Sequence, residues 1–304
     1  MTGLSARLFE RGEGIKVCLY MKKIQVKTMT DNSRDKIFGG LIGCAIGDAL
    51  GAPFEGMNGD EKRSVEMTGG GQFNLKKGEV TDDTLMMIAL GETYCETGKF
   101  NKEVFLKKVI LTVREDGRTF GKTTKTVVSL LEQGCSPEGT VYAVHKIFGS
   151  GTNGSVMRTL PVGLVSVSDR EKIAREVSAF THYDKAAGEC CAIISKTAAG
   201  LVAGKSKTDV LSDIPQEYLR GKLVPSIDAV ETTKCALACF RDGNTYEEVI
   251  QNACMLGGDT DTIGCIAGGL AGIIWEIPEK WMDQLLIKNK IRDLADQLKK
   301  VTGE

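Results

Sequence analysis

Two short acid-rich segments contain the residues best suited to chemistry. They are Thr81-Asp82-Asp83-Thr84 and Asp259-Thr260-Asp261-Thr262, and each stands where a loop leads into an apolar segment of helical character. Carboxylate and hydroxyl oxygens are the hard ligands that Mg²⁺ and Mn²⁺ prefer. If the fold brings the two segments together, we expect them to form a site for two divalent cations.

Helix capping is the alternative explanation, because Asp and Thr are frequent at helix N-termini. A well-placed acid at that position contributes about 0.3–1 kcal/mol. Two carboxylates about 4 Å apart repel each other by roughly 4 kcal/mol at an effective dielectric constant near 20. Capping therefore accounts for one acid in each segment, whereas a converged set of four acids requires cations.

The second segment shares its acid-x-acid spacing with the acid-x-acid-x-Thr string of aspartyl-phosphate phosphatases, in which the acids follow a buried strand. Here the preceding residues, Tyr246 to Met255, predict a helix, and Gly257 and Gly258 then end it. The acids thus open a helix and do not close a strand, which disfavours a phosphatase.

Three further features are weaker candidates. The segment from Phe148 to Met157 contains three glycines and several hydroxyl or amide residues, so its backbone N–H groups could face an anion. It lacks the Lys-Ser/Thr ending of a P-loop and follows no predicted strand, so a plain connecting loop is the alternative. His182 stands at a predicted helix entrance and Glu55 at the end of a glycine-rich helix. A hydrogen-bonded structural histidine and a solvated carboxylate are their alternatives.

Composition excludes several classes of protein. The 304 residues are 42% hydrophobic and 26% charged, with 39 basic against 40 acidic side chains. Such a balance gives no reason to expect a nucleic-acid or membrane partner. The segment from Ile263 to Trp275 is too short and glycine-rich to cross a bilayer, and the N-terminus lacks a signal-peptide pattern. We expect a cytoplasmic protein.

The ten cysteines do not predict a disulfide or zinc framework. No C-x-x-C occurs, and only two histidines are available for a mixed zinc site. Seven of the ten stand in apolar stretches: Cys44, Cys190, Cys191, Cys235, Cys239, Cys254 and Cys265. We expect these to be small buried hydrophobes in a reducing compartment.

The elements that must position these residues are predicted to be helices. Glycines recur every four residues in two apolar stretches: Gly39, Gly43, Gly47 and Gly51, then Gly264, Gly268 and Gly272. This spacing places them on one helix stripe, where another helix can approach closely. Each glycine weakens an isolated helix by about 1 kcal/mol, so tertiary packing must hold both helices. Asp48 lies within the first stripe and is expected to be a hydrogen-bonded structural residue.

The rest of the chain predicts further helices and no β-α-β alternation or internal repeat. The predicted segments are Leu85 to Tyr94, Lys102 to Arg114, Thr123 to Glu132, Ile173 to Ser178, Ala186 to Ala203, Ile227 to Phe240, Tyr246 to Met255 and Met282 to Val301. We expect an all-α fold with a single compact multi-helix domain over residues 35–304. Residues 1–34 are expected to be an N-terminal arm, disordered or upstream of the true start.

In this order the motifs resemble those of the ADP-ribosylglycohydrolase family, which includes the enzyme that reactivates ADP-ribosylated dinitrogenase reductase. The matching strings are Gly39-Gly-Leu-Ile-Gly-Cys-Ala-Ile-Gly-Asp-Ala-Leu-Gly51 with Glu55, Thr81-Asp-Asp-Thr84, Asn153-Gly-Ser-Val-Met-Arg158, Thr181-His182 and Gly257-Gly-Asp-Thr-Asp-Thr262. Together they run from about Asp35 to Pro278.

The resemblance implies a cleft with a binuclear Mg²⁺ or Mn²⁺ centre. Its metal ligands would be Thr81, Asp82, Asp83, Asp259, Asp261 and Thr262. Glu55 and Asp82 would be catalytic, and the residues that contact ADP-ribose would be Gly151, Asn153, Gly154, Ser155, Met157 and His182. The substrate would be an ADP-ribosylated protein or a small ADP-ribosyl compound.

The implied reaction is hydrolysis of the glycosidic bond between ADP-ribose and its acceptor by metal-activated water. A non-catalytic ADP-ribose-binding protein and a metal-dependent phosphohydrolase are the alternatives. One departure concerns the acceptor. Relatives that act on arginine-linked ADP-ribose often carry Asp-x-Gly before a Thr-Thr pair, and Thr119 stands here in place of that acid. Arginine specificity is therefore in doubt, and serine-linked, other O-linked or small-molecule substrates remain open.

Overall fold

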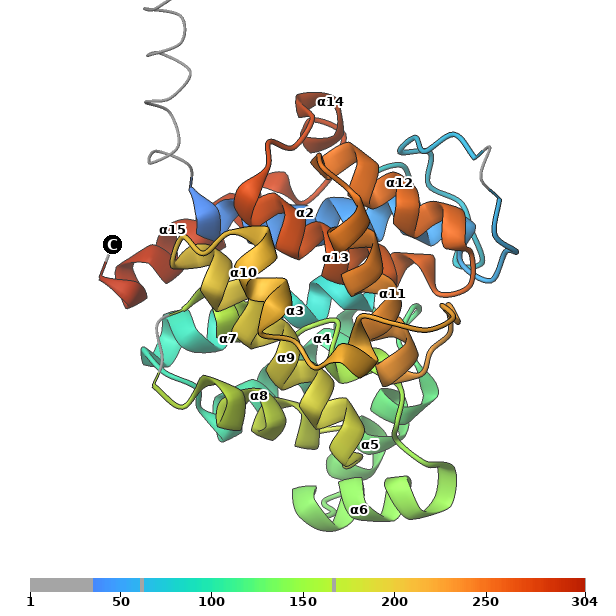
Figure 1. Ribbon diagram of the computed structural model, residues 1–304. Helices are drawn as coiled ribbons and strands as arrows, with labels where there is room; N and C mark the ends of the chain where they lie inside the picture. The colour runs from blue at the N-terminus through green and yellow to red at the C-terminus, as the bar shows by residue number, and fades with distance from the viewer. Residues whose placement is uncertain (1–34, 61–62, 166–167, 304) are drawn as a thin grey trace, which may run out of the picture. The chain divides into compact units, whose positions relative to one another are not determined.

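The computed structural model describes residues 35–60, 63–165 and 168–303, and within these ranges it contains fourteen α-helices and no β-strand. The α-helices are α2 (Lys36–Gly51), α3 (Asp82–Thr97), α4 (Lys102–Glu115), α5 (Lys122–Glu132), α6 (Pro137–Phe148), α7 (Leu160–Leu164), α8 (Arg170–Ala179), α9 (Lys185–Val202), α10 (Lys207–Ser212), α11 (Ala229–Asp242), α12 (Tyr246–Leu256), α13 (Thr260–Ile274), α14 (Glu279–Met282) and α15 (Lys288–Thr302). Three short 3-10 helices are η1 (Ala52–Phe54), η2 (Asn153–Ser155) and η3 (Gln216–Tyr218). The all-α class is confirmed (Figure 1). The predicted N-terminal arm lies outside the described residues.

Helices α2 and α13 form the centre of the unit that begins at Lys36 (Figure 1). Their glycine stripes face each other in antiparallel register. A Cβ atom at Gly39, Gly43 or Gly47 would lie 2.2, 2.3 or 2.0 Å from the carbonyl oxygen of Gly272, Gly268 or Gly264, respectively. The two backbones therefore touch, and no larger side chain fits between them. The predicted close packing of both stripes is confirmed.

The register of this pair determines where the site forms. A Cβ atom at Gly51, the last residue of α2, would lie 2.2 Å from the carbonyl oxygen of Thr260, the first residue of α13. Because the helices are antiparallel, the C-terminal end of one meets the N-terminal end of the other. Glu55, just after α2, is thereby brought to Asp259 and Asp261.

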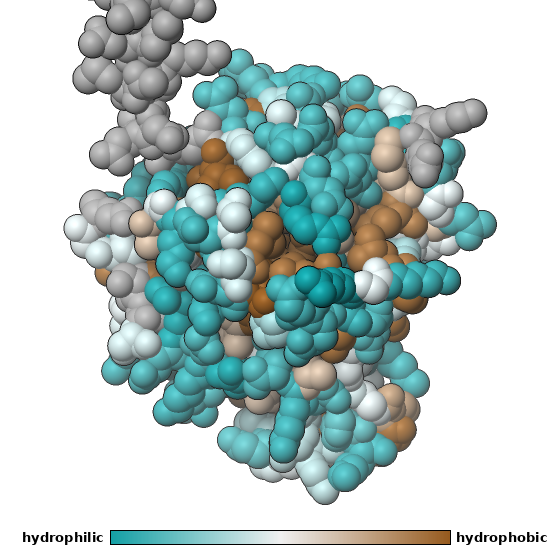
Figure 2. Space-filling model, viewed as in Figure 1, coloured by the Kyte–Doolittle hydropathy of each residue, from teal (hydrophilic) through white to brown (hydrophobic). Residues whose placement is uncertain are grey.

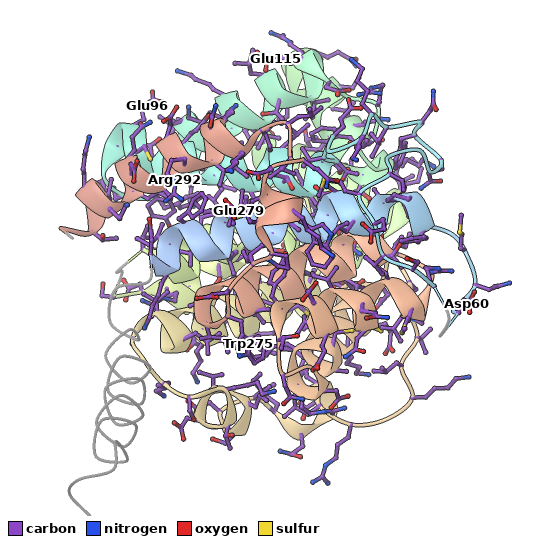
Figure 3. The ribbon with its side chains drawn as sticks, turned by 90° about the horizontal axis from the view of Figure 1, so that it is seen from above. Asp60, Glu96, Glu115, Trp275, Glu279 and Arg292 are labelled. Carbon is purple, nitrogen blue, oxygen red and sulfur yellow. The ribbon has the colours of Figure 1, made fainter. Side chains whose placement is uncertain are left out.

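The remaining helices cover this central pair. Figure 3 shows α2 crossing the middle of the unit, with side chains packed on both sides of it. Arg292 of α15 places its guanidinium 3.1 Å from the ring centroid of Phe38 in α2. Hydrophilic side chains cover most of the face in Figure 2, and hydrophobic side chains show mainly in a hollow near its middle. The seven cysteines in apolar stretches are buried and free, as predicted.

The sequence analysis overlooked one property of α2. Residues Lys36–Phe54 are long and apolar enough to cross a membrane by length and composition, but 94% of the apolar window is buried inside the protein. Packing against α13 accounts for this apolar character, because both faces of α2 contact other helices.

Eight predicted helices correspond to α3, α4, α5, α8, α9, α11, α12 and α15, with differences at their ends. The segment from Met282 to Val301 is divided, since α14 ends at Met282 and α15 begins at Lys288. Helices α7 and α10 were not predicted because five or six residues are too few to show a helical period. Helix α6 was also missed. It packs on α5 through a small separate cluster of Val127, Val141 and Val144.

Candidate metal centre and ligand cavity

Both acid-rich segments open onto one cavity of about 650 Å³. Five carboxylates line one part of it and are called the acidic floor: Glu55, Asp82, Asp83, Asp259 and Asp261. Residues 149–154 are called the glycine loop, and all of them except the buried Ser150 line another part. The cavity also receives the predicted site residues Gly151, Asn153, Gly154, Met157, His182 and Thr262. The structure therefore brings together eleven of the thirteen predicted site residues.

The N-terminus of α3 is capped without the carboxylates of the floor. Asp48, fully buried in α2, accepts hydrogen bonds from the backbone N–H groups of Thr81, at 3.0 and 3.1 Å, and of Thr84, at 3.2 Å. Burial raises the pKa of Asp48 to about 6, although these hydrogen bonds oppose the shift. The prediction that Asp48 is a hydrogen-bonded structural residue is confirmed.

Two hydroxyl groups satisfy the next backbone donors of α3. Thr119 Oγ1 accepts from the N–H of Asp82 at 2.8 Å, and Thr81 Oγ1 accepts from the N–H of Asp83 at 3.3 Å. The carboxylates of Asp82 and Asp83 are thus not engaged in capping this helix. Capping does not explain why two acids stand here.

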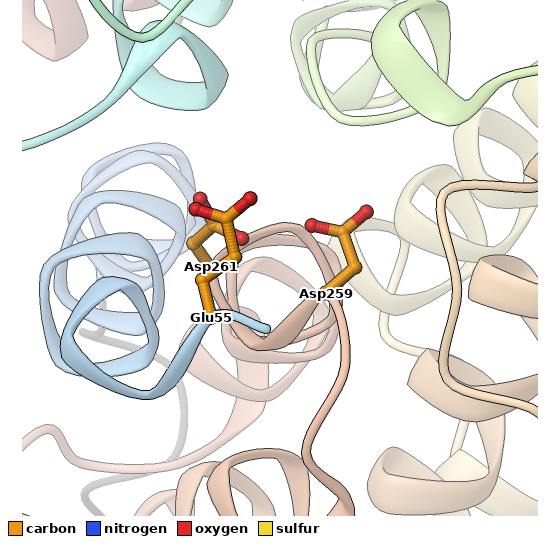
Figure 4. A group of neighbouring side chains, drawn as sticks. All are labelled: Glu55, Asp259 and Asp261. Atoms are coloured by element: carbon orange, nitrogen blue, oxygen red, sulfur yellow. The ribbon is translucent and has the colours of Figure 1, made fainter. Parts of the chain in front are cut away.

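At the second segment, Asp259 occupies the N-cap position of α13 but makes no side-chain capping bond. Its Oδ2 accepts a short hydrogen bond from Asn153 Nδ2 of the glycine loop. Asp261 Oδ1 accepts from the N–H of Thr262 at 2.9 Å. One ligand atom each from Glu55, Asp259 and Asp261 lies within 4.8 Å of the other two. Figure 4 shows these carboxyl groups reaching the same side of the helix ends that carry them.

Burial and mutual repulsion disfavour the charged forms of the floor acids. Burial, with repulsion from Asp48, raises the pKa of Asp82 to about 8. Burial is also the largest cause that raises the pKa values of Glu55, Asp83, Asp259 and Asp261. Buried like charges of this kind are stabilised by cations.

Two oxygens of the floor have no hydrogen-bond partner although they are buried: Asp83 Oδ1 and Glu55 Oε2. Buried oxygens without partners are costly unless another group binds them. Unsatisfied oxygens, crowded carboxylates and nearby hydroxyls form a hard-oxygen donor set, which fits divalent cations such as Mg²⁺ and Mn²⁺. Among the described residues no nitrogen or sulfur ligand joins this group.

The glycine loop forms a wall of different chemistry. It is fixed by backbone hydrogen bonds from Asn153 N to Ile227 O at 2.9 Å and from Ala229 N to Gly151 O at 2.8 Å. His182 is buried beside it, and its Nε2 lies 2.9 Å from Thr152 Oγ1. Burial, reinforced by the Arg158 guanidinium, lowers the pKa of His182 to about 3. The imidazole is therefore neutral near pH 7.

Two predicted site residues do not line the cavity. Thr81 is fully buried, and its hydroxyl group donates to Asp83 Oδ2 at 3.1 Å. Ser155 lies behind the loop, where its Oγ accepts from Ser178 Oγ at 2.8 Å. Ser155 thus supports the loop from within the core.

Three residues at or behind the cavity wall, Thr152, Lys122 and Arg158, were not among the predicted site residues. Thr152 and Lys122 line the cavity, and Arg158 lies behind the glycine loop with no exposed surface. Among the described residues that line the cavity, Lys122 is the only lysine or arginine, and its Nζ lies 4.0 Å from the ring centroid of Phe148. Arg158 ends the run Asn153-Gly-Ser-Val-Met-Arg158, but its burial was not predicted, because arginine is rarely fully buried.

A second cavity of about 540 Å³ is lined by residues of α8, α9 and α10. It contains none of the predicted site residues. The functional assignment therefore concerns the cavity with the acidic floor.

Comparisons with known proteins all point to one family. A family model described as ADP-ribosylglycohydrolase matches residues 29–304. The ADP-ribosylarginine hydrolase Tri1 of Pseudomonas putida is 28% identical over 298 residues, covering 88% of this chain and 79% of that protein. The ADP-ribosyl-[dinitrogen reductase] glycohydrolase of Rhodospirillum rubrum is 28% identical, covering 88% of this chain and 97% of that protein. A solved structure titled ADP-ribosylglycohydrolase-related protein complex superposes with a TM-score of 0.76 at 27% identity, covering 88% of this chain and 98% of that one.

Proposed function

Because the chain belongs to the ADP-ribosylglycohydrolase family, we propose that the cavity binds the ADP-ribosyl group of its substrate and that the acidic floor carries out the hydrolysis. The observation that carries this proposal is the position of four buried carboxylates and the half-buried Glu55 beside a glycine loop in one cavity. The carboxylates suit cations, and the loop suits an anion. A substrate that joins a ribose to a diphosphate requires both.

The floor residues would hold two divalent cations, Mg²⁺ or Mn²⁺. Asp82 and Asp83 come from the start of α3, and Asp259, Asp261 and Thr262 come from the start of α13. Thr81 would contribute through its hydroxyl group. Cations bound there supply Lewis-acid chemistry, since they acidify water and hold sugar hydroxyls.

Glu55 and Asp82 are the proposed catalytic carboxylates. Glu55 has a buried oxygen without a partner, so it can accept a hydrogen bond from the attacking water. The carboxylate of Asp82 lines the cavity, and the backbone N–H of this residue is satisfied by Thr119 Oγ1, so the carboxylate can accept a proton from water. Either would orient or deprotonate water for attack on the anomeric carbon through an oxocarbenium-like transition state. The acceptor side chain then leaves with a proton.

The acceptor is proposed to be a protein side chain, in line with relatives whose names specify ADP-ribosylarginine and ADP-ribosylated dinitrogen reductase. Thr119 bears on the linkage because it stands in the cavity wall with its oxygen engaged by the N–H of Asp82. It offers no negative charge to a guanidinium. Arginine-linked, serine-linked and O-acetyl ADP-ribose are therefore all candidate substrates. A reducing, cytoplasmic location is proposed as well, supported by the free buried cysteines.

The test is product analysis on a panel of these three substrates, with Mg²⁺, Mn²⁺ or a chelator. We expect metal-dependent release of free ADP-ribose from at least one of them. Release of inorganic phosphate would instead indicate a phosphohydrolase. Binding of ADP-ribose without turnover of any substrate would favour a non-catalytic binding protein.

A further inference from the structure

We propose that Arg158, Thr181 and His182 form a hydrogen-bond relay that turns the hydroxyl proton of Thr152 into the cavity, where it donates to a diphosphate oxygen of the ligand. Thr152 is the binding residue, and the other three are positioning residues. This inference rests on the proposed function, because it assumes that an ADP-ribosyl group occupies the cavity.

The relay is continuous in the structure. Arg158 Nη2 donates to Thr181 Oγ1 at 2.9 Å, and Thr181 Oγ1 lies 2.7 Å from His182 Nδ1. On the other side of the ring, His182 Nε2 lies 2.9 Å from Thr152 Oγ1. Thr152 lines the cavity and is half-buried, whereas Arg158, Thr181 and His182 are buried.

The direction of the relay follows from counting donors. A hydroxyl group has one proton and can accept two hydrogen bonds, and a neutral imidazole has one N–H and one acceptor nitrogen. Thr181 Oγ1 already accepts from Arg158, so its own proton is available for His182 Nδ1. The imidazole then carries its proton on Nε2 and donates to Thr152 Oγ1. Thr152 accepts there, so its own proton is left for the cavity.

The opposite direction is less favourable. If His182 Nδ1 carried the proton, Thr181 Oγ1 would accept two hydrogen bonds and its own proton would have no partner along the relay. The proton of Thr152 would then point back to His182 Nε2 and not into the cavity. A buried donor without a partner costs about 1–3 kcal/mol, so the first direction is preferred.

Two surrounding groups hold the imidazole in place. Arg158 Nη2 also donates to Val177 O at 2.8 Å, which fixes the guanidinium behind the loop. A Cβ atom at Gly154 would lie 3.0 Å from His182 Cε1 and 3.1 Å from its Nε2, so the ring packs directly on the loop backbone. The other two polar side chains of the glycine loop have partners: Asn153 donates to Asp259 and to Thr232 Oγ1, and the buried Ser150 lies 2.9 Å from His145 Nδ1. Thr152 is thus the hydroxyl available to the ligand.

A diphosphate oxygen is the expected acceptor for physical reasons. The glycine loop carries no acid, whereas carboxylates crowd the floor. Asp228 also lines the cavity beside the loop, but its Oδ1 accepts from the N–H groups of Val230 and Glu231 at 3.0 Å. A buried guanidinium behind the loop also favours negative charge in front of it. Hydrogen bonds to charged acceptors are stronger than those to neutral ones.

The direction of the relay can be measured without any substrate. The chain has two histidines, so ¹⁵N-histidine labelling gives two ring systems, and the His145→Gln variant identifies that of His182. At pH 7 we expect a neutral His182 ring protonated on Nε2. A ring protonated on Nδ1, or a charged ring, would overturn the relay.

The role of Thr152 is tested by affinity for ADP and ADP-ribose in the presence of Mg²⁺. Thr152→Val should weaken both affinities by about tenfold or more, and Thr152→Ser should retain them. Thr181→Val should weaken them less and move the His182 proton to Nδ1, whereas Thr181→Ser should restore both readouts. Unchanged affinities in Thr152→Val, or a loss confined to ADP-ribose, would contradict the contact with diphosphate.

The two hypotheses fail separately. A wild-type protein without hydrolase activity but with Nε2-protonated His182 and a Thr152-dependent affinity for ADP would reject the proposed function and retain the relay. An active hydrolase whose Thr152→Val variant keeps its KM would reject the relay alone.

Discussion

The acidic floor and the glycine loop face the same cavity but are built in opposite ways. The floor consists of carboxylates whose pKa values are raised by burial, and two of its oxygens have no partner. A neutral histidine stands beside the loop and a buried guanidinium behind it, and both donate or accept hydrogen bonds, although Arg158 Nε has no partner. One side is completed by cations, whereas the other already offers protons to an anion.

This difference separates chemistry from recognition. Substitutions in the floor should abolish turnover but should not change the affinity for the diphosphate part of the ligand. Substitutions in the loop should weaken that affinity but should not change the rate of the chemical step.

The first prediction concerns the loss of one carboxylate from the acidic floor. Asp261→Asn removes one charge from the group formed with Glu55 and Asp259, so it should weaken cation binding and lower kcat by roughly a hundredfold or more. ADP affinity in the absence of divalent cations should stay within about threefold of wild type. Asp242→Asn, an exposed acid on α11, is the control. Full activity of Asp261→Asn at limiting metal would refute the ligand assignment.

The second prediction tests the packing that creates the floor. In Gly47→Ala, the new Cβ would lie 2.0 Å from Gly264 O, so the two central helices must separate. We expect a loss of about 3 kcal/mol or more in the free energy of unfolding, measured by denaturant titration. At Gly121 a Cβ meets nothing within 4 Å, so Gly121→Ala should cost at most about 1 kcal/mol. Equal stability of the two variants would show that the close helix contact is not required.

The third prediction concerns a substitution in the glycine loop. Gly154→Ala places a methyl group 3.0 Å from His182 Cε1 and should displace the imidazole from Thr152. We expect KM to rise about tenfold with kcat changed less than threefold, as measured by steady-state kinetics. If kcat falls while KM is unchanged, the loop takes part in the chemical step and the separation is wrong.

The fourth prediction concerns acid stability. His182 has a pKa of about 3 in the folded state and about 6.5 when unfolded, so between these values only the unfolded chain binds the proton. This residue therefore makes stability fall as pH is lowered from about 6.5 to 3, by at most about 1.4 kcal/mol per pH unit. His182→Gln should show a shallower fall than wild type over this range in chelated samples. Parallel stability curves would mean that folding does not lower the pKa of His182.

Some of this arrangement was predictable from the sequence. The acid segments, the loop and the glycine stripes are local patterns, and each predicts its own element. The two stripes also have matching spacing. Gly39 faces Gly272 and Gly47 faces Gly264, so the residue numbers of each facing pair add up to the same value, as expected for antiparallel helices. That register places Glu55 beside Asp259, but a single stripe does not specify its partner helix.

Other features depended on contacts between distant residues. Asp48 and Thr119 come from other parts of the chain and accept hydrogen bonds from the first backbone N–H groups of α3. The floor carboxylates are therefore not needed for capping, and no local sequence pattern predicts this. Ser155 resembles a loop ligand in sequence, but Ser178 holds it on the inner side. The burial of Arg158 was unpredictable for the same reason, because Val177 and Thr181 supply its acceptors.

The most direct test measures Mn²⁺ binding and ADP-ribose release on the same chelated sample as Mn²⁺ is added back. The substrate is the most active member of the linkage panel. We expect no ADP-ribose release from the chelated wild-type protein. As Mn²⁺ is added back, release should rise and reach its maximum when two ions are bound. The Asp261→Asn variant should neither bind two ions nor recover release. Full release from the chelated protein, or release that does not follow Mn²⁺ binding, would contradict the assignment of the floor as the catalytic metal centre.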